Sequence, residues 1–536
     1  MKITCTIMEA GISLAPEDIT YQLKDSEYLC FLDSSLIPDK YSRFSYVGWG
    51  PSFVLKSSGI KNEFINISRN IKNHSYRDPL GFYREHVKDF VLYGSREKKK
   101  DLRIIRWEGN RTAEVRIPDK YNDQSIPDFL GGFMGYFSYD LKDFIEKLPH
   151  TTKDDLDIPL IYQGFYTRLL VFDHRRDKWY FIRDYIDAEG NDRLLEILGR
   201  EDLMASGTGE DVIRGRAAAE LGAVMDLFDG VPAHNRDRII EKYLKHPIEK
   251  VRLAPDLSKK EYLKGVRKTK DYINEGDIYQ VNFSQRFQAE VPLHPMDLYY
   301  VLRGKNAAPF SAYLKYPEFS IGSSSPERFL YLKDGIIETR PIKGTRPRGK
   351  DKIEDMKNAR ELEESIKDRA ELNMIVDLER NDLGKFCYYG TVKVTEHAVI
   401  EKYARVFHSV STVTGDVKEG TDTSDIIKAT FPGGSITGAP KIRAMEIIDE
   451  LETVSRGVYT GSIGYISIDN TMDLNIVIRT FIIKDGCFYY NVGGGIVADS
   501  FPRMEYQETL DKGIALQDTL NFFKKNNLAG LQRGDK

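Results

Sequence analysis

The sequence predicts an α+β protein, and three observations support this prediction. Residues 1–185 alternate short apolar runs with turns, as in GGFMGYFSYDL (131–141), which is typical of a strand-rich region. Two Asp-Gly pairs, Asp334-Gly335 and Asp485-Gly486, stand between apolar stretches and predict tight antiparallel hairpins. Segments with helix caps and helical spacing lie between these strand signals, so we expect helices and antiparallel strands in one chain.

Length indicates how the chain is organised. At 536 residues it exceeds one ordinary core, which favours two to four folding units or one unusually large α/β body. The segment AAAELGAVMDLFDGVP (217–232) predicts a short helix that ends at Gly230 and Pro232. Changes in composition and motif density suggest four regions: a strand-rich part at 1–185, a charged helical connector at 186–257, a motif-rich part at 258–520 and a polar tail at 521–536.

Composition excludes several function classes. The formal net charge of −4 leaves no basic excess for an extended nucleic-acid footprint. No segment has the length and apolarity of a membrane span, so we do not expect a membrane protein. Glu9 interrupts the apolar N-terminal stretch, so we expect no signal peptide and a cytoplasmic protein. The four cysteines have no C-x-x-C spacing, which favours reduced, structural thiols.

A helix and a strand are well specified where the motif-rich region begins. The run S-K-K-E (258–261) is a capping box, and Gly276 is a stop signal after apolar residues at near-helical spacing. The following IYQVNFSQRF (278–287) alternates as a strand does. One face of this strand carries Tyr279, Val281, Phe283 and Phe287, and the other carries Gln280, Asn282, Ser284 and Arg286.

The hairpin at Asp334-Gly335 allows a prediction of register. If the pairing of the two strands is extended away from the turn, Glu327 lies opposite Ile342, one position from Lys343. A carboxylate and an amine would then lie close together. A regular pleat would put the two side chains on opposite faces. The prediction therefore requires the prolines before Glu327 and Ile342 to distort the strand ends.

Two acidic pairs have helical spacing: Asp368 with Glu371, and Glu505 with Glu508. Each pair, three residues apart, shares one helix face, and two opposed faces would form a four-carboxylate cage for a hard cation such as Mg²⁺. Taken singly, each pair is more typical of a solvated helix face.

Two glycine-rich runs could bind an anion. In FPGGSITGAPK (431–441), Ala439-Pro440 replaces the Lys-Ser/Thr of a nucleotide-binding loop, but the turn and the helix after it can still offer backbone N–H groups to a carboxylate. The run VGGGIV (492–497), which we expect to follow a strand, can do likewise. Tight turns without a ligand are the alternative for both.

Two further side chains stand in apolar surroundings. His408 is more typical of a satisfied interior histidine than of an acid-base group. Arg479, in NIVIRT, costs free energy to bury without an anion, which favours a carboxylate clamp over a structural ion pair.

Five segments together resemble the chorismate-utilising enzymes, the family of anthranilate synthase component I and aminodeoxychorismate synthase component I: DIYQVNFSQRF, RPIKGTRPRG, DRAELNMIVDLERNDLG, FPGGSITGAPKIRAMEIIDELE and VGGGIVADS. The resemblance covers about residues 258–520 and is weaker before residue 185, where LDSS (32–35) and YSRFSYVG (41–48) match the family's N-terminal part. It implies a large antiparallel β-sandwich flanked by helices, and Mg²⁺-dependent chemistry on chorismate.

The resemblance also implies residue roles. Glu371 and Glu508 resemble direct metal ligands, with Asp368 and Glu505 acting through water. The holders of the substrate carboxylates would be Tyr459, Arg479, Lys512, Gly493, Gly494 and Gly495; the ring pocket would include Thr345, His408, Ser435 and Thr437; a tryptophan site around LDSS would include Leu32, Asp33, Ser34, Tyr41 and Ser42.

Two positions indicate the reaction. Gln280 lies where members that add water to chorismate carry a lysine; an amide cannot remove a proton, so ammonia is the expected nucleophile and isochorismate and salicylate formation are excluded. Lys343, in PIKGT, resembles the lysine of aminodeoxychorismate synthases, whereas anthranilate synthases carry alanine.

The resemblance implies that Lys343 attacks C2 as the C4 hydroxyl leaves, and that ammonia then adds at C4 and expels the lysine. Glu327 would protonate the leaving hydroxyl and later act as base. This amine must be unprotonated, and we expect Mg²⁺ and three nearby cations to lower its pKa: Arg340, Arg346 and Arg348.

The sequence therefore predicts amination of chorismate to 4-amino-4-deoxychorismate, on the route to 4-aminobenzoate and folate. No G-x-C-x-G nucleophile turn is present, so ammonia should come from glutamine through a separate amidotransferase subunit. The chain also ends too soon after residue 520 for a fused lyase. Anthranilate synthase component I and a tryptophan-binding regulatory subunit are the alternatives.

Overall fold

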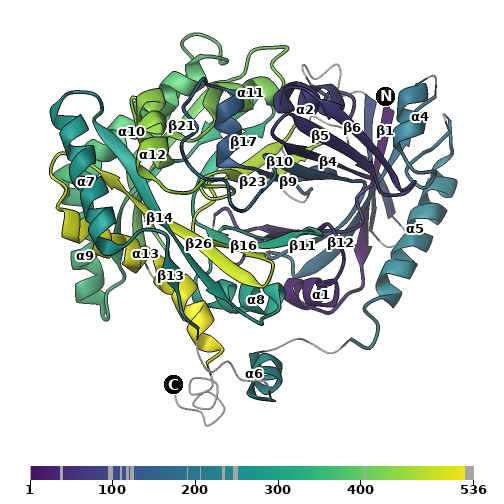
Figure 1. The fold of residues 1–536 in the computed structure, drawn as a ribbon. Coiled ribbons are helices and arrows are strands. Elements are labelled where there is room, and N and C mark those ends of the chain that lie inside the picture. The colour runs from purple at the N-terminus through teal and green to yellow at the C-terminus, as the bar shows by residue number, and fades with distance from the viewer. Residues whose placement is uncertain are drawn as a thin grey trace.

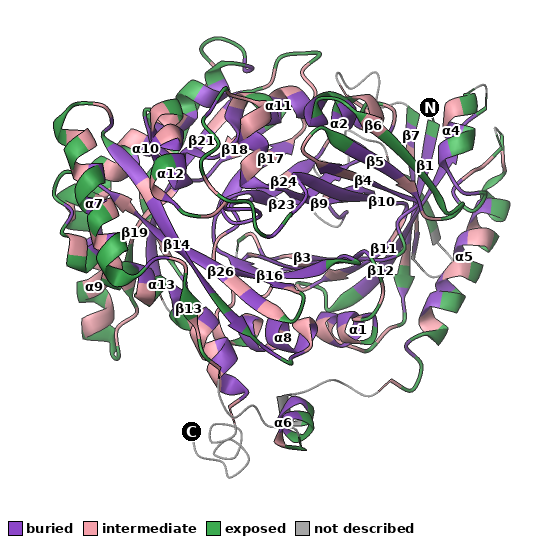
Figure 2. Ribbon diagram, in the orientation of Figure 1, coloured by how far each residue is buried: buried purple, intermediate pink, exposed green. Residues whose placement is uncertain are grey.

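The computed structural model describes residues 2–36, 40–93, 101–108, 111–115, 120, 126–189, 191–205, 207–231, 236–245, 251–403 and 406–524. Two large, mostly antiparallel sheets face each other, and helices cover their outer faces (Figure 1). Strands are largely buried and the outer helices are partly exposed (Figure 2). This arrangement confirms the α+β class and the flanked sandwich.

The first sheet joins strands from both ends of the chain. Its order is β13 (Ala254–Pro255), β14 (Gln280–Glu290), β26 (Cys487–Ile496), β25 (Thr480–Lys484), β16 (Phe319–Ser325), β15 (Phe310–Lys315), β2 (Leu29–Asp33), β3 (Phe44–Gly48), β11 (Arg168–Asp173), β12 (Lys178–Asp187), β1 (Lys2–Ala10), β7 (Leu102–Glu108) and β8 (Arg111–Val115), with β22 (Gly438–Ala439) paired to β14.

The second sheet is antiparallel and likewise joins strands from both ends of the chain. Its order is β19 (Ile342–Pro347), β21 (Val406–Asp416), β18 (Ile336–Thr339), β17 (Arg328–Lys333), β24 (Met472–Asn475), β23 (Ser462–Ser467), β9 (Gly132–Phe137), β10 (Ile161–Tyr166), β4 (Phe53–Ser58), β5 (Lys61–Asn66) and β6 (Ile71–Tyr76), with β20 (Lys393–Lys402) paired to β21. Residues 1–185 and 258–520 thus share both sheets, and the predicted boundary at 185 falls inside β12.

Helices lie outside the sheets. They are α1 (Pro16–Gln22), α2 (Pro79–Val87), α4 (Asp192–Ile197), α5 (Glu210–Asp226), α6 (Arg236–Lys245), α7 (Lys259–Asn274), α8 (Pro295–Lys305), α9 (Lys352–Glu364), α10 (Ile366–Gly384), α11 (Thr423–Thr430), α12 (Lys441–Leu451) and α13 (Pro502–Phe522), with 3₁₀ turns η2 (Tyr139–Phe144) and η3 (Gly434–Ile436). Among the described helices, none is long and apolar enough to cross a membrane.

Local signals place several elements correctly. The capping box of α7 is formed in both directions, with Glu261 N–H donating to Ser258 Oγ at 3.3 Å and Ser258 N–H donating to Glu261 Oε2 at 2.8 Å. Both Asp-Gly hairpins are present, with Lys333 opposite Ile336 and Lys484 opposite Cys487. Both residues of each turn have positive φ, as this turn type requires.

Other boundaries differ from the prediction. Helix α5 begins at Glu210, seven residues before the predicted start, and ends at Asp226; Pro232 lies outside the described residues. The run VGGGIV does not follow a strand, because Val492–Ile496 lie inside β26. The four cysteines are free, as predicted. Of the predicted tail, residues 521–522 belong to α13, and 525–536 lie outside the described residues.

The predicted register around Glu327 is wrong. The hairpin ladder runs only from Lys333–Ile336 to Tyr331–Glu338, and Ile342 pairs with Val410 of β21 instead. Strand β18 ends at Thr339, before Pro341, which has no N–H, while β17 continues to Arg328 through pairing with β24 on its other edge. The two segments still meet, because the backbone N–H of Ile342 donates to the Glu327 carboxylate.

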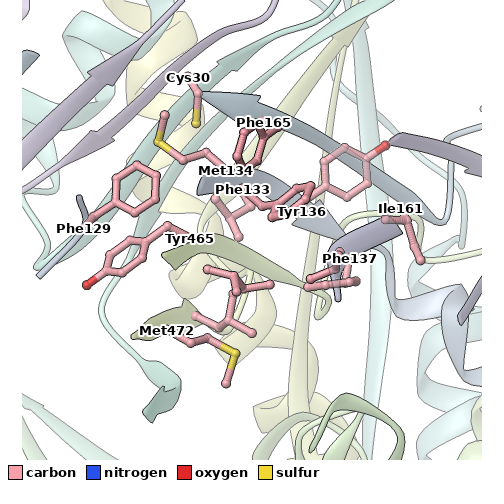
Figure 3. Packing of buried hydrophobic residues seen from close by; sticks show 14 of the residues in the cluster. Cys30, Phe129, Phe133, Met134, Tyr136, Phe137, Ile161, Phe165, Tyr465 and Met472 are labelled. Atoms are coloured by element: carbon pink, nitrogen blue, oxygen red, sulfur yellow. The ribbon is translucent and has the colours of Figure 1, made fainter. Parts of the chain in front are cut away.

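The main core lies between the sheets and contains many aromatic rings (Figure 3). Phe53 and Phe165 stack with ring centroids 5.0 Å apart, and Phe129 contacts Tyr465 at 4.8 Å. Every residue of β9 is buried, and a Cβ on its Gly135 would lie 2.1 Å from the Tyr162 carbonyl oxygen. This core fixes the two sheets against each other and holds the sandwich edge where the candidate site lies.

Candidate active site

Two crossovers between the sheets place Glu327 and Arg479. Strand β16 passes to β17 through Glu327, and β24 passes to β25 through Arg479, which has a φ of +53°. Backbone bonds tie the crossovers together: Ile476 N–H donates to Glu327 O at 3.0 Å and Ser324 N–H donates to Arg479 O at 3.2 Å. The two crossovers therefore lie side by side, and the Arg479 charge acts on the Glu327 carboxyl.

Glu327 is suited to hold or release a proton. Its side chain is 5% exposed, and burial raises its pKa, whereas the Ser435 hydroxyl, Lys343, the Ile342 amide and Arg479 act in the opposite direction. A buried carboxyl with a raised pKa is suited to act as acid and then as base.

Lys343 projects from β19 toward the glycine-rich turn at 432–438, which we call the glycine turn. Its Nζ donates to the Ser435 carbonyl oxygen at 3.2 Å. Burial and then Lys512 lower the pKa of the Lys343 amine, while Glu371, Glu327 and Glu508 raise it. Burial thus favours the neutral, nucleophilic form of the amine.

The arginine part of the predicted cause is not supported. None of the three arginines of RPIKGTRPRG is among the largest influences on the Lys343 pKa, and each is paired with its own carboxylates. These pairs are Arg340 with Glu396 at 3.3 Å and Glu401 at 2.5 Å, Arg346 with Glu361 at 3.1 Å and Asp368 at 3.0 Å, and Arg348 with Asp355 at 2.7 Å.

The glycine turn contacts both reactive groups through Ser435. The Ser435 carbonyl accepts from Lys343, and its hydroxyl is near enough to Glu327 to lower the pKa of that carboxyl, so one residue lies beside both amine and carboxyl. Thr437 is fully buried; its hydroxyl donates to Gly433 O at 3.0 Å and its carbonyl accepts Asn282 N–H at 2.7 Å. Thr437 therefore holds the turn together.

The three glycines of β26, Gly493, Gly494 and Gly495, lie next to Gln280 and to the α13 side chains Glu508 and Lys512. A Cβ on Gly495 would lie 2.3 Å from Gln280 Nε2, and one on Gly494 would lie 3.5 Å from Glu508 Oε1. Lys512 Nζ donates to Gly493 O at 3.0 Å and pairs with Glu508 at 2.7 Å. Gln280 is 1% exposed, and within the described residues no donor reaches its Oε1.

The acidic pairs lie on α10 and α13. Burial raises the pKa of Glu371 and of Glu505, and the Glu508 charge adds to both shifts. Although burial acts to raise it, Lys512 lowers the pKa of Glu508 itself. Carboxylates on two helices that destabilise one another's charge are hard oxygen donors suited to Mg²⁺.

Cationic side chains neutralise part of this acidic group in the structure. Lys367 lies 3.8 Å from Glu371, and Arg346 holds Asp368. Across the part of the chain that is described, no three acidic, histidine or cysteine side chains lie close enough together to hold one ion. The donor chemistry fits Mg²⁺, and binding would require these side chains to exchange their lysine and arginine contacts.

His408 and Tyr459 complete the polar lining. His408 Nδ1 shares a hydrogen bond of 2.9 Å with Thr345 Oγ1, and no described residue bonds its Nε2. Burial and then Arg479 lower the pKa of His408 to about 3, so its imidazole is neutral near pH 7. Tyr459 is 7% exposed and lies near the Arg456 guanidinium.

Sequence reasoning missed a buried ion pair behind the site. Arg456 and Glu452 are 3% and 6% exposed, and Arg456 Nη2 lies 2.7 Å from Glu452 Oε1. Arg456 also donates to Ile436 O at 3.1 Å and Asn282 O at 2.7 Å, and Glu452 accepts from the N–H and hydroxyl of Ser284 at 2.8 Å. The i, i+4 spacing of Glu and Arg was the available signal.

A separate cavity of about 390 Å³ opens between the sheets near residue 33. Leu32, Asp33, Ser34 and Tyr41 line it, whereas Ser42 is buried and is not part of its wall. The Asp33 carboxylate is already engaged by the Tyr299 hydroxyl and the Arg303 guanidinium, each at 2.8 Å.

Comparisons with known proteins identify the family. The family model described as "chorismate binding enzyme" matches residues 86–518. Aminodeoxychorismate synthase component 1 of Bacillus subtilis is 39% identical over 398 residues, which is 74% of this chain and 78% of the relative. Anthranilate synthase component 1 of Acetivibrio thermocellus is 36% identical over 510 residues, 95% of this chain and 92% of the relative.

A solved structure shows the same architecture. The crystal structure of anthranilate synthase component I from Streptococcus pneumoniae superimposes with a TM-score of 0.66 and 29% identity, covering 89% of this chain and 92% of that one. A matched sequence model over most of the chain, long relatives and a shared fold all point the same way. The chain belongs to the chorismate-binding enzymes.

Proposed function

We propose that this protein aminates chorismate at C4 to give 4-amino-4-deoxychorismate. One observation carries the proposal: Lys343, an amine whose pKa burial lowers, meets Glu327, a buried carboxyl, at Ser435. Direct amination at C2 requires no enzyme nucleophile. Replacement of the C4 hydroxyl with retention requires two displacements, for which a neutral lysine is the suitable group.

The steps balance without an external oxidant or reductant. Lys343 forms a bond to C2, the ring double bond shifts, and the C4 hydroxyl leaves as water with a proton from Glu327. Ammonia then adds at C4, the bond between Lys343 and C2 breaks, and Glu327 takes up a proton. Arg479, Lys512 and the β26 glycines would hold the substrate carboxylates, and neutral His408 would contact the ring.

Mg²⁺ is part of the proposal as a cofactor. Glu371 and Glu508 would bind it directly, and Asp368 and Glu505 through water. When bound, the ion would neutralise a substrate carboxylate and stabilise developing charge. The ammonia donor is proposed to be a glutamine amidotransferase subunit, in line with relatives named as component 1 of a synthase.

Replacement of Lys343 by alanine tests the proposal. We expect formation of 4-amino-4-deoxychorismate from chorismate and ammonium to fall at least about 100-fold, since the nucleophile is lost. Lys350→Ala, an exposed lysine of the same segment, is the matched control. Undiminished product formation by Lys343→Ala would refute the proposal.

Anthranilate synthesis is the second candidate, supported by relatives of that name with similar identity and longer coverage. It releases pyruvate, so pyruvate and anthranilate in the same assay would assign that reaction instead. A third proposal concerns the cavity at residue 33, whose size and aromatic wall would accept tryptophan. Calorimetric titration with tryptophan tests it, and heat without any chorismate turnover would favour a purely regulatory chain.

A further inference from the structure

Glu379 is a buried carboxyl that the proposed chemistry does not use. It lies on α10, two turns after Glu371, and is 2% exposed. Its Oε1 accepts the N–H of Gly434 at 3.0 Å, and within the described residues no donor reaches Oε2. Burial, and secondly the Asp382 charge, raise the pKa of Glu379 to about 7, while Lys441 and the Gly434 amide act to lower it. An acid is costly to bury in this way, so its single directed bond needs a functional reason.

The bond reaches the reactive groups through one residue. The glycine turn lies directly on α10, because a Cβ on Gly434 would lie 2.7 Å from Leu378 Cδ2 and 3.0 Å from Glu379 Oε1. The next residue, Ser435, accepts from Lys343 with its carbonyl, and its hydroxyl is near enough to Glu327 to lower the pKa of that carboxyl. Movement of the Gly434 amide would therefore move the group that joins amine and carboxyl.

The same helix holds the entry of the turn by a second route. Asp382, one helical turn after Glu379, pairs with Lys441, whose Nζ donates to Thr430 O and to Pro432 O at 2.8 Å each. Glu379 thus fixes the centre of the turn directly, and Asp382 fixes its start through Lys441. Since α10 also carries Glu371, this helix sets the distance between the glycine turn and the acidic pair.

We propose that Glu379 is a positioning residue, whose carboxyl oxygen holds the Gly434 amide so that Ser435 keeps Lys343 and Glu327 aligned for attack and proton transfer. The inference rests on the proposed function for the roles of those two side chains. It requires an oxygen acceptor on α10 and does not require a negative charge. Misplacement of reacting groups by about 1 Å costs on the order of 100-fold in rate.

The test uses three variants and a matched control. Glu379→Gln keeps an oxygen acceptor, Glu379→Leu removes it, and Gly434→Ala pushes the turn away from α10 with the acceptor intact. Asp377→Asn, an exposed acid of the same helix, is the control. The rate of chorismate consumption with ammonium is measured per mole of folded enzyme, with folding checked by circular dichroism and gel filtration, and kcat and KM are determined separately.

We expect Glu379→Gln to keep kcat within about threefold, and Glu379→Leu and Gly434→Ala to lose about 10- to 100-fold in kcat with KM within about threefold. Equal losses in the Gln and Leu variants, or a normal kcat for folded Glu379→Leu, would overturn the inference. If Glu379→Leu does not fold, the kcat of Gly434→Ala is the measurement that tests the inference. Because the readout is chorismate consumption, a product analysis that refutes C4 amination remains a separate result.

Discussion

The buried pair Arg456–Glu452 should be among the most sensitive points of the structure. Arg456→Met removes a guanidinium that bonds Glu452, Ile436 O and Asn282 O, and leaves the Glu452 carboxylate, 6% exposed, without its counter-charge. Breaking one partner of a buried ion pair costs about 3 to 5 kcal/mol. Melting entropy is about 2.1 cal/mol/K per residue, or roughly 1.1 kcal/mol/K for 536 residues, so the apparent Tm should fall by roughly 3 to 4 °C.

Scanning calorimetry on the Arg456→Met, Glu452→Gln and double variants measures this effect. The double variant leaves no unpaired charge, so its loss should be smaller than the sum of the single losses by about 1 to 3 kcal/mol. Arg360→Met is the control, because Arg360 and Glu364 form an exposed pair of the same spacing, and its Tm should stay unchanged. Additive single losses, or a Tm change in Arg456→Met no larger than in the control, would refute the reasoning.

Three further predictions follow from the site. Because the folded-state pKa of His408, about 3, lies below its usual 6.5, the unfolded chain takes up a proton that the folded chain does not. This contribution to stability is complete above about pH 6.5 and is lost as pH falls toward 3. In calorimetry His408→Gln should therefore show a shallower fall of Tm between pH 6 and 4 than the wild type, and parallel curves would contradict this. Arg479→Lys should raise KM for chorismate at least about tenfold, since lysine cannot form a bidentate carboxylate pair, and an unchanged KM in steady-state assays would remove Arg479 from the substrate clamp. Chelation with EDTA should abolish turnover, and added Mg²⁺ should restore it. The Glu371→Gln and Glu508→Gln variants should each need at least about tenfold more Mg²⁺ for the half-maximal rate. Full activity in EDTA would argue against the metal.

Local signals in the sequence were sufficient for some elements. Ser258 and Glu261 fix the start of α7 because a capping box involves only four neighbouring residues. The turns at Asp334-Gly335 and Asp485-Gly486 form because positive φ is required at both positions. The polar face of β14 is likewise a property of its own alternation, although Tyr279 just before the strand is 71% exposed rather than buried.

Long-range pairing was not predictable from these signals. The register of Glu327 fails because the β17–β18 ladder stops at Tyr331 and Glu338, and Ile342 pairs with Val410 of β21, which is distant in the sequence. The pKa of Lys343 was predicted in the right direction, but its largest cause is burial, and tertiary contacts pair Arg346 and its two neighbouring arginines with carboxylates. Glu379 lies within the segment DRAELNMIVDLERNDLG, but nothing in the sequence singled it out, because its contact with the glycine turn depends on the tertiary packing of α10.

The central claim is that Lys343 becomes covalently attached to the substrate ring. Intact-protein mass spectrometry of the enzyme incubated with chorismate and Mg²⁺, in the absence of ammonia, measures this directly. The account predicts a species heavier than the protein by one chorismate less one water, mapped to the peptide containing Lys343, that disappears when ammonium is added. A single unmodified mass under conditions where ammonium supports turnover would contradict it.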